Sequence, residues 1–278
     1  MIQLGLIGYP LGHSLSPKIH TAALKACGLE GGYSLFPIAP GDRQGLRDLF
    51  QRMRSGEIRG LNVTIPHKQN VIEFMDELTS TAKAIGAVNT IYMRDDKLIG
   101  DNTDAFGFLA DLNRFLTLEC ASLLAHEHKN ALVLGAGGSA RAVVYALLND
   151  GWKVSLAARR IEQAEGLANS FNGKDIKAIN FAGFEHSIFD LLVNTTPMGM
   201  TPNIDQSPWP GGIPFPKAAV IYDLVYNPRE TKLVKDAYSQ GLNATTGLGM
   251  LIEQAGLAFE LWTTHRPSRD LLWNATQG

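Results

Sequence analysis

The chain has 278 residues, of which 45% are hydrophobic, and a formal net charge of −2. This length exceeds what one core usually supports, so we expect two domains. Acidic and basic residues are mixed along the chain, which argues against a nucleic-acid-binding surface. No apolar run is long enough to span a bilayer. Because Cys27 and Cys120 have neither metal-ligand spacing nor disulfide partners, we expect a cytoplasmic protein.

The first hundred residues alternate between strand and helix patterns. Ile2–Ile7 reads as a buried strand, and the next helix is expected to be capped by Ser16, with Pro17 in its first turn and Gly28 at its end. The later expected elements are a strand at Tyr33–Ile38, a helix at Asp42–Ser55, a strand at Leu61–Ile65, helical segments at Lys68–Glu73 and Thr79–Ile85, a hairpin of Val88–Met93 with Leu98–Ile99, and a helix at Thr103–Phe115. This order predicts a parallel α/β domain.

A glycine-rich turn marks a second α/β domain. The aliphatic run Leu132–Leu134 stops at Gly135, and a helical pattern begins about four residues later. Gly135, Gly137 and Ala140 match the G-x-G-x-x-G/A spacing of dinucleotide-binding turns, in which a helix N-terminus faces the phosphates. The alternative is a tight turn that binds nothing.

The end of the following strand indicates which dinucleotide binds. After the strand Lys153–Ala157 come Ala158, Arg159 and Arg160, with no acidic residue before Glu162. NAD sites usually place a carboxylate here, whereas guanidinium groups suit a 2′-phosphate. The sequence therefore favours NADP over NAD. The alternative is that both arginines form only a solvated strand end.

The rest of the chain completes the predicted two-domain α/β fold. Further strands are expected at Ile176–Ile179, Leu191–Val193 and Val220–Tyr222, and helices at Leu248–Thr264 and Ser268–Trp273. The segment 195–216 contains six of the thirteen prolines, so we expect an irregular loop that could cover a cofactor. We assign 105–246 to a Rossmann-like cofactor domain. Residues 1–104 form a substrate domain with 247–278, whose apolar helices are expected to return to it.

Polar side chains gather after the strands of the first domain. They are Ser14 and Ser16, then Asn62, Thr64 and Lys68, then Asn89, and finally Asp101, Asn102 and Asp104. Such a set suits a small polyhydroxylated molecule that carries a carboxylate. Each residue also has a structural alternative: Ser16 could only cap its helix, Asn62 and Thr64 could lie on an exposed strand face, and Asp101 or Thr103 could cap the next helix.

Several motifs, in order and across nearly the whole chain, resemble those of the shikimate dehydrogenase family. They are Gly12–Pro17, Gly60–Lys68, Gly86–Thr90, Gly100–Asp104, Gly135–Gly138, Asn194–Met200 and Tyr226–Pro228. The resemblance implies reversible NADP-linked reduction of 3-dehydroshikimate to shikimate, in the route to chorismate and the aromatic amino acids. It also implies that Lys68 and Asp104 form the catalytic pair.

The resemblance further implies two sets of binding residues and no metal. Substrate would contact Ser14, Ser16, Asn62, Thr64, Asn89, Tyr226 and Gln254. Cofactor would contact Gly135, Ala136, Gly137, Gly138, Ser139, Ala158, Arg159, Arg160, Leu224 and Gly247. Where the family usually has Asn-Arg-Thr, this chain has Ala158–Arg160, so one amide is missing and one cation is added. Ser80 replaces an acid found in some members and is given no role.

The expected chemistry depends on Lys68. Hydride transfer to a ketone places negative charge on the oxygen, which an ammonium group can stabilise and protonate. Rival functions are a quinate/shikimate dehydrogenase with relaxed substrate or cofactor choice, a non-catalytic NADP-sensing module, and a folate- or aminoacyl-linked dehydrogenase. The paired serines Ser14 and Ser16, the retained Lys68 and Asp104, and the absence of an acid at 158–160 favour the strict NADP enzyme. We expect a monomer or homodimer.

Overall fold

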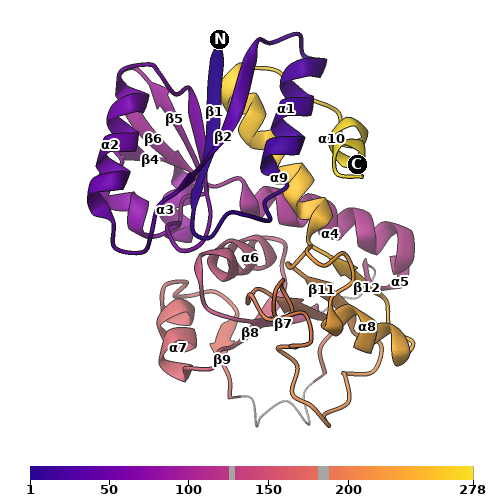
Figure 1. Cartoon of the computed structure of the whole chain (residues 1–278). Coiled ribbons are helices and arrows are strands. Elements are labelled where there is room, and N and C mark those ends of the chain that lie inside the picture. Colours follow the sequence, from indigo (N-terminus) through magenta and orange to yellow (C-terminus); the bar gives the residue numbers. More distant parts are fainter. Residues whose placement is uncertain (125–128, 181–187, 278) are drawn as a thin grey trace. The chain divides into compact units, whose positions relative to one another are not determined.

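The computed structural model describes residues 1–124, 129–180 and 188–277 (Figure 1). It divides into two compact units, one formed by Met1–Gly107 with Ile252–Gly278 and the other by Phe108–Leu251. Each unit contains a six-stranded sheet with helices packed on it, as expected for the two-domain α/β class.

The sheet of the first unit is parallel except for one strand. Its strands are β1 (Ile2–Gly8), β2 (Gly31–Pro37), β3 (Gly60–Val63), β4 (Glu77–Leu78), β5 (Thr90–Arg94) and β6 (Lys97–Asp101), in the spatial order β2-β1-β3-β5-β6-β4. The strand β5 pairs antiparallel with both β3 and β6. The expected hairpin is therefore confirmed. Its turn at Asp95 and Asp96 has φ angles of 49° and 60°, a conformation that acidic residues tolerate better than most.

Helices from both ends of the chain cover this sheet. They are α1 (Ser16–Ala26), α2 (Arg43–Arg54), the 3₁₀ helix η1 (Asn70–Phe74), α3 (Ser80–Ile85), α9 (Leu248–Thr263) and α10 (Arg269–Ala275). The C-terminal helices, yellow in Figure 1, lie beside α1 and the first strands. The indole of Trp262 on α9 fills the space above Gly60, where an added Cβ would lie 2.3 Å from the ring, and donates a hydrogen bond to the Ile91 carbonyl. The return of the tail to the first sheet is thus confirmed.

Two local expectations in this unit, the Ser16 cap and the helix at 68–73, are wrong, and so is the alternative that Asp101 or Thr103 caps the next helix. Ser16 does not cap α1, because it is the first helical residue and no side chain accepts a bond at the cap position, Leu15. Neither Asp101 nor Thr103 caps α4 (Asp104–Glu119); the Asn102 carboxamide oxygen instead accepts bonds from the backbone N–H groups of Asp104 and Ala105. The helical pattern at 68–73 forms only the short helix η1.

The second unit has an entirely parallel sheet. Its strands are β7 (Asn130–Leu134), β8 (Lys153–Ala157), β9 (Ile176–Ala178), β10 (Leu191–Asn194), β11 (Val220–Asp223) and β12 (Ala244–Thr246). The spatial order is β12-β11-β10-β7-β8-β9, which is the Rossmann order 3-2-1-4-5-6 when the strands are counted from β7. The order reverses between β7 and β10. In such sheets, ligands bind at the carboxyl ends of the strands that flank this reversal.

The remaining helices of the second unit are α5 (Ala121–Leu124), α6 (Gly138–Asn149), α7 (Ile161–Asn169) and α8 (Lys232–Ser239). The proline-rich segment 195–219 forms only turns and bends, so the expected irregular loop is confirmed; a covering role for it stays a prediction. It is anchored by Trp209, which stacks on Phe215 in the core with Leu233 and Val234 of α8.

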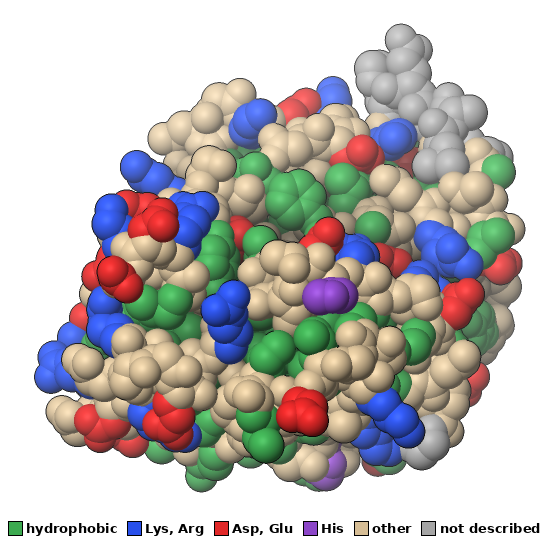
Figure 2. Space-filling model, turned by 90° about the horizontal axis from the view of Figure 1, so that it is seen from above, with side chains coloured by type: hydrophobic (Ala, Val, Ile, Leu, Met, Phe, Trp, Pro, Cys, Tyr) green, Lys and Arg blue, Asp and Glu red, His purple; other side chains and the backbone are tan. Residues whose placement is uncertain are grey.

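Surface charge follows the balanced composition. Basic and acidic side chains are interspersed, with scattered hydrophobic groups, over the face shown in Figure 2. Every helix in the described part of the chain falls short of the length or apolar content that crossing a bilayer requires. The same residues contain no group of three or more His, Cys, Asp or Glu side chains placed to hold a metal ion.

Candidate active site

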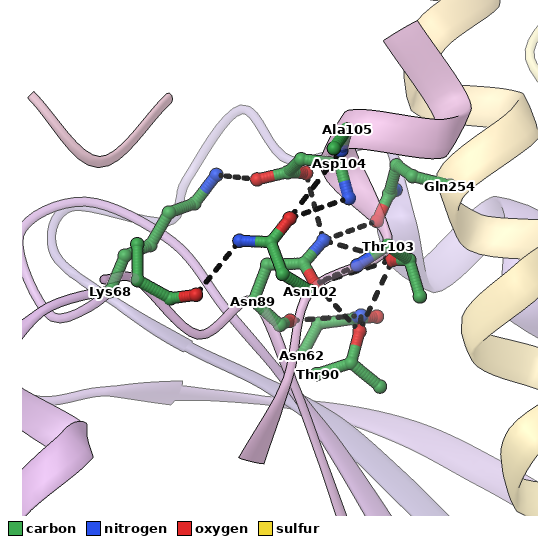
Figure 3. Close-up of polar contacts among 10 residues, drawn as sticks. Asn62, Lys68, Asn89, Thr90, Asn102, Thr103, Asp104, Ala105 and Gln254 are labelled. Atoms are coloured by element: carbon green, nitrogen blue, oxygen red, sulfur yellow. Dashed lines mark hydrogen bonds and ion pairs between the residues drawn. The ribbon is translucent and has the colours of Figure 1, made fainter. Parts of the chain in front are cut away.

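A lysine–aspartate ion pair lies at the carboxyl ends of the first unit's strands. Lys68 follows β3, and Asp104 begins α4 directly after β6. The two side chains point toward each other (Figure 3), with the Lys68 Nζ 2.6 Å from Asp104 Oδ2. The side chains of Lys68 and Asp104 are 11% and 6% exposed, so the pair is nearly buried but still reachable from solvent. The Asn102 cap fixes the start of α4 and thereby the position of the carboxylate.

Asn89 joins this pair to the C-terminal helix. Its side-chain nitrogen donates to Asp104 Oδ1 at 2.8 Å and lies 3.3 Å from the Gln254 Oε1, which comes from α9 (Figure 3). Its oxygen accepts a bond from the Thr103 backbone N–H at 2.7 Å. The structure therefore brings together Lys68, Asp104, Asn89 and Gln254, which the sequence resemblance placed in one site.

Thr103, for which the sequence pattern suggested only a possible role as a helix cap, lies within this site. It is 4% exposed, and its hydroxyl accepts a bond from the Asn89 side-chain nitrogen at 3.0 Å. Its position between Asn102 and Asp104 in the motif Gly100–Asp104 was the available signal. The buried Thr103 hydroxyl therefore helps to hold the Asn89 side chain, which in turn binds Asp104.

Asn62 is held from both ends of its amide. It is 5% exposed, so the alternative of an exposed strand face is wrong for this residue. Its oxygen accepts a bond from the Tyr33 hydroxyl at 2.9 Å, while its nitrogen lies 3.3 Å from the Asn89 carbonyl and 3.4 Å from the Thr90 hydroxyl. These contacts place Asn62 against the backbone of Asn89 and therefore next to the ion pair.

A buried histidine supports Tyr33. The ring of His20 is 1% exposed and stacks on Tyr33 with centroids 4.4 Å apart and planes 3° from parallel. Burial lowers the pKa of His20 to about 3, against the smaller opposing effect of the Asn62 amide. His20 is therefore neutral at physiological pH and acts as an aromatic support.

The other expected substrate residues lie near strand ends. Ser14 follows β1, and its hydroxyl accepts a bond from the Ser16 backbone N–H at 3.2 Å. Thr64 follows β3 and packs over Gly8, where an added Cβ would lie 2.4 Å from its methyl group. Tyr226 belongs to the second unit, where burial raises the pKa of its hydroxyl.

The glycine-rich turn of the second unit has the geometry that a pyrophosphate needs. Gly135 has a φ of +109° and lies so close to Thr195 that an added Cβ would be 2.5 Å from its hydroxyl oxygen. At Gly137 an added Cβ would meet no described atom within 4 Å, so the backbone there is open to a ligand. The helix α6 begins at Gly138, followed by Ser139, and Ala140 is buried against the sheet. The residues from Gly135 to Ala140 thus fit a dinucleotide.

Two arginines stand where the adenosine ribose would lie. Arg159 and Arg160 follow β8 and Ala158 and are exposed, and within the described residues neither forms an ion pair. They are therefore available to an anion such as a 2′-phosphate. Gly247 follows β12, at the opposite edge of the sheet from β9, and lies against the backbone of Leu224, because an added Cβ would be 2.2 Å from the Leu224 carbonyl oxygen.

A Rossmann-like unit with a glycine-rich turn, together with a second α/β unit that holds a lysine–carboxylate pair, defines a two-domain oxidoreductase. Three family models match the chain: "Shikimate dehydrogenase substrate binding domain" over residues 6–91, "Shikimate / quinate 5-dehydrogenase" over 119–203, and "Shikimate 5'-dehydrogenase C-terminal domain" over 247–277. The shikimate dehydrogenase (NADP(+)) of Bacillus subtilis is 38% identical over 271 residues, which cover 95% of this chain and 92% of that protein. The chain belongs to the shikimate dehydrogenase family.

Solved structures agree with this assignment. The shikimate 5-dehydrogenase of Thermus thermophilus in complex with NADP(H) and shikimate has a TM-score of 0.86 and 35% identity, and the match covers 100% of this chain and 99% of that one. The quinate dehydrogenase of Corynebacterium glutamicum in complex with NAD has a TM-score of 0.85 and 31% identity, covering 99% and 98%. The fold is therefore common to relatives that differ in substrate and cofactor.

Proposed function

We propose that the chain catalyses the reversible, NADP-dependent reduction of 3-dehydroshikimate to shikimate, a step of aromatic amino acid biosynthesis. The observation that carries the proposal is the Lys68–Asp104 pair, with 2.6 Å between Nζ and Oδ2, among the buried amides of Asn62 and Asn89. A family relative whose structure holds both NADP(H) and shikimate supports it. In this proposal, residues 1–104 and 247–278 bind substrate and 105–246 bind cofactor.

The residues of the chain supply the proton and its orientation. When bound, NADPH supplies the hydride. In the direction of reduction, the Lys68 Nζ donates a hydrogen bond to the ketone oxygen and passes a proton to it as negative charge develops; in the reverse direction the neutral amine accepts the hydroxyl proton. Asp104 holds the ammonium group with one oxygen, while Asn89 binds its other oxygen. The lysine is thereby oriented before the substrate arrives.

Binding roles follow from the chemistry of the side chains. The hydroxyls of Ser14 and Ser16 suit the substrate carboxylate, and Asn62, Thr64, Asn89, Tyr226 and Gln254 suit its hydroxyl groups. The turn Gly135–Ser139 would hold the pyrophosphate, Arg159 and Arg160 the 2′-phosphate, and Leu224 and Gly247 the nicotinamide half. A cytoplasmic location and a monomeric or homodimeric state belong to the same proposal.

One assay tests the proposed function. The purified chain is incubated with shikimate and NADP, and formation of NADPH is followed by its absorbance. Turnover with shikimate and NADP is expected. The proposal is refuted if shikimate is turned over neither with NADP nor with NAD.

A second candidate is a quinate/shikimate dehydrogenase with relaxed choice. The observation that favours this second candidate is the similarity of the chain to a quinate dehydrogenase in complex with NAD. The same assay with quinate, and with NAD in place of NADP, separates the two: comparable kcat/KM values for shikimate and quinate, or for the two cofactors, support the second candidate.

A further inference from the structure

The second unit contains a buried carboxylate whose hydrogen-bond donors, among the residues that the structure describes, are all neutral. Asp223, the last residue of β11, is 0% exposed. Its Oδ1 accepts bonds from the Asn194 side-chain nitrogen at 2.7 Å and from the Val225 N–H at 3.0 Å, and its Oδ2 accepts one from the Thr231 hydroxyl at 2.6 Å. Burial raises the pKa of Asp223 to about 6, although these three bonds oppose the rise. A buried carboxylate is costly, and the donors that offset this cost are fixed in place by it.

Asn194 extends this arrangement to the loop after β10. Its side-chain oxygen accepts bonds from the Thr196 N–H at 2.9 Å and the Thr196 hydroxyl at 2.8 Å. The neighbouring Thr195 hydroxyl donates to the Leu134 carbonyl at 2.6 Å, directly before Gly135. The carboxylate therefore fixes, through Asn194, the backbone that lies against the glycine-rich turn.

On its other side, Asp223 fixes the loop after β11. The Val225 N–H is bound directly, and the Thr231 hydroxyl that donates to Asp223 also accepts the bond from Val234 N that caps α8. The Leu224 N–H donates to the Asn194 carbonyl at 2.9 Å, and the Leu224 carbonyl lies against Gly247. Both ends of the segment 224–231 are thus attached to one side chain.

The position of these loops in the sheet indicates what they serve. A Rossmann sheet consists of two halves that each take one mononucleotide, divided where the strand order reverses. The glycine-rich turn and Arg159 belong to the half formed by β7 to β9, which takes the adenosine part. The loops held by Asp223 follow β10 and β11 in the other half of the sheet. These loops therefore belong to the half that binds the nicotinamide part of the cofactor.

We propose that Asp223 is a positioning residue for the nicotinamide half of the cofactor, acting through the loops 195–198 and 224–231. The inference rests on the proposed function, because it takes NADP as the cofactor. Asp223 does not contact substrate or transfer a proton. It fixes the backbone of the two loops that would contact the nicotinamide ring.

The test compares Asp223→Asn with the unaltered chain. The carboxamide keeps the shape but has one acceptor oxygen in place of two and carries no charge, so it cannot keep all three charge-assisted bonds that the carboxylate accepts. We expect the Kd of NADPH, measured by fluorescence titration, to rise about tenfold or more and kcat to fall. The Kd of 2′,5′-ADP, which contains only the adenosine part, should be unchanged. A purely structural role would weaken both ligands alike or neither.

Further variants separate the outcomes. Asp236→Asn, on the exposed face of α8 where the residue pairs with Lys232, should leave both affinities unchanged. The double variant Asn194→Asp with Asp223→Asn swaps the two side chains and so keeps one acid and one amide in contact. Its NADPH affinity should be higher than that of Asp223→Asn alone. If Asp223→Asn does not fold, Thr231→Ala replaces it, with Thr231→Ser as its hydroxyl-retaining control, and the same selective loss is expected.

Unchanged NADPH affinity in Asp223→Asn, or equal loss of NADPH and 2′,5′-ADP, would overturn the inference. If Thr231→Ala and Thr231→Ser are used instead, equal NADPH affinities of these two variants would also overturn the inference. If the unaltered chain binds NADPH but these variants show no selective loss, only the inference fails. If the unaltered chain does not bind NADPH, the proposed function itself fails.

Discussion

Each unit contains a carboxylate at the end of its sheet that is bound by an asparagine, and the two carboxylates differ in their remaining partner. Asp104 accepts a bond from the Asn89 side-chain nitrogen at 2.8 Å, and Asp223 accepts one from that of Asn194 at 2.7 Å. The second oxygen of Asp104 binds the Lys68 ammonium, whereas that of Asp223 binds the Thr231 hydroxyl. Asp104 thus holds an ammonium group with a transferable proton, whereas Asp223 holds the neutral groups of two loops.

The comparison shows how one motif serves two purposes. An ammonium group on a flexible stem can approach a substrate and exchange a proton, so its partner must stay near the surface of the site. A threonine hydroxyl and a backbone N–H group do not ionise at physiological pH and donate no proton to a substrate, so their partner can be fully buried. The exposed fraction of the whole residue is in line with this division, at 4% for Asp104 and 0% for Asp223.

The largest expected effect is the loss of the transferable proton. Lys68→Ala removes the ammonium group and should lower kcat by about 10²–10⁴-fold, the usual contribution of a general acid–base group, with a much smaller change in KM. Steady-state kinetics with shikimate and NADP measures both constants. Lys232→Ala, which removes an exposed ion-paired lysine from α8, is the control. A loss confined to KM would mean that Lys68 only binds substrate.

The sequence was sufficient for features that depend on local pattern. Aliphatic runs predicted most strands, and Gly135 with Gly137 predicted the turn between β7 and α6. The strands β4 and β12 were missed because two and three residues are too few to show a period. The order of the strands was also out of reach, since it depends on contacts between segments distant in the sequence.

In the candidate site, too, only the residues that lie within sequence motifs could be predicted. Lys68 and Asp104 could be named because motifs surround them, but the cap of α4, Asn102, was not foreseen, and only its neighbours Asp101 and Thr103 were considered as possible caps. Asp223 was missed because a single acid at the end of an apolar strand reads as an exposed strand end. Only the tertiary structure shows that three donors converge on it.

The pH dependence of stability gives the next effect. The pKa of Asp223 is about 6 in the folded chain against an ordinary value of 3.8, so the folded state holds a proton that the unfolded state lacks between these values. Its contribution to the free energy of unfolding should therefore rise as pH falls from about 7 to about 4, by roughly 2–3 kcal/mol. Asp223→Asn lacks this contribution. Urea unfolding of both proteins at several pH values measures the difference, and a pH-independent difference would contradict the assigned pKa.

A smaller effect is expected at the exposed arginines of the second unit that would bind the 2′-phosphate of NADP. Arg159→Ala should reduce kcat/KM for NADP about 10- to 100-fold and leave that for NAD nearly unchanged, because a charge-assisted bond to phosphate contributes roughly 1.5–3 kcal/mol. The ratio of the two values is the measurement. Arg160→Ala, tested beside it, shows which guanidinium carries the preference. If neither variant changes the ratio, the two arginines form only a solvated strand end.

The smallest effect concerns a neutral donor in the first unit. Tyr33→Phe removes the hydroxyl that binds the Asn62 oxygen at 2.9 Å and leaves the amide free to reorient, so KM for shikimate should rise about 2- to 10-fold with kcat little changed. Tyr238→Phe is the matched control, since its hydroxyl donates to the Ala244 carbonyl at the same 2.9 Å in the second unit. A fall in kcat with constant KM would instead place Tyr33 with the proton-transferring groups, and the division between the two carboxylates would then not extend to the residues around them.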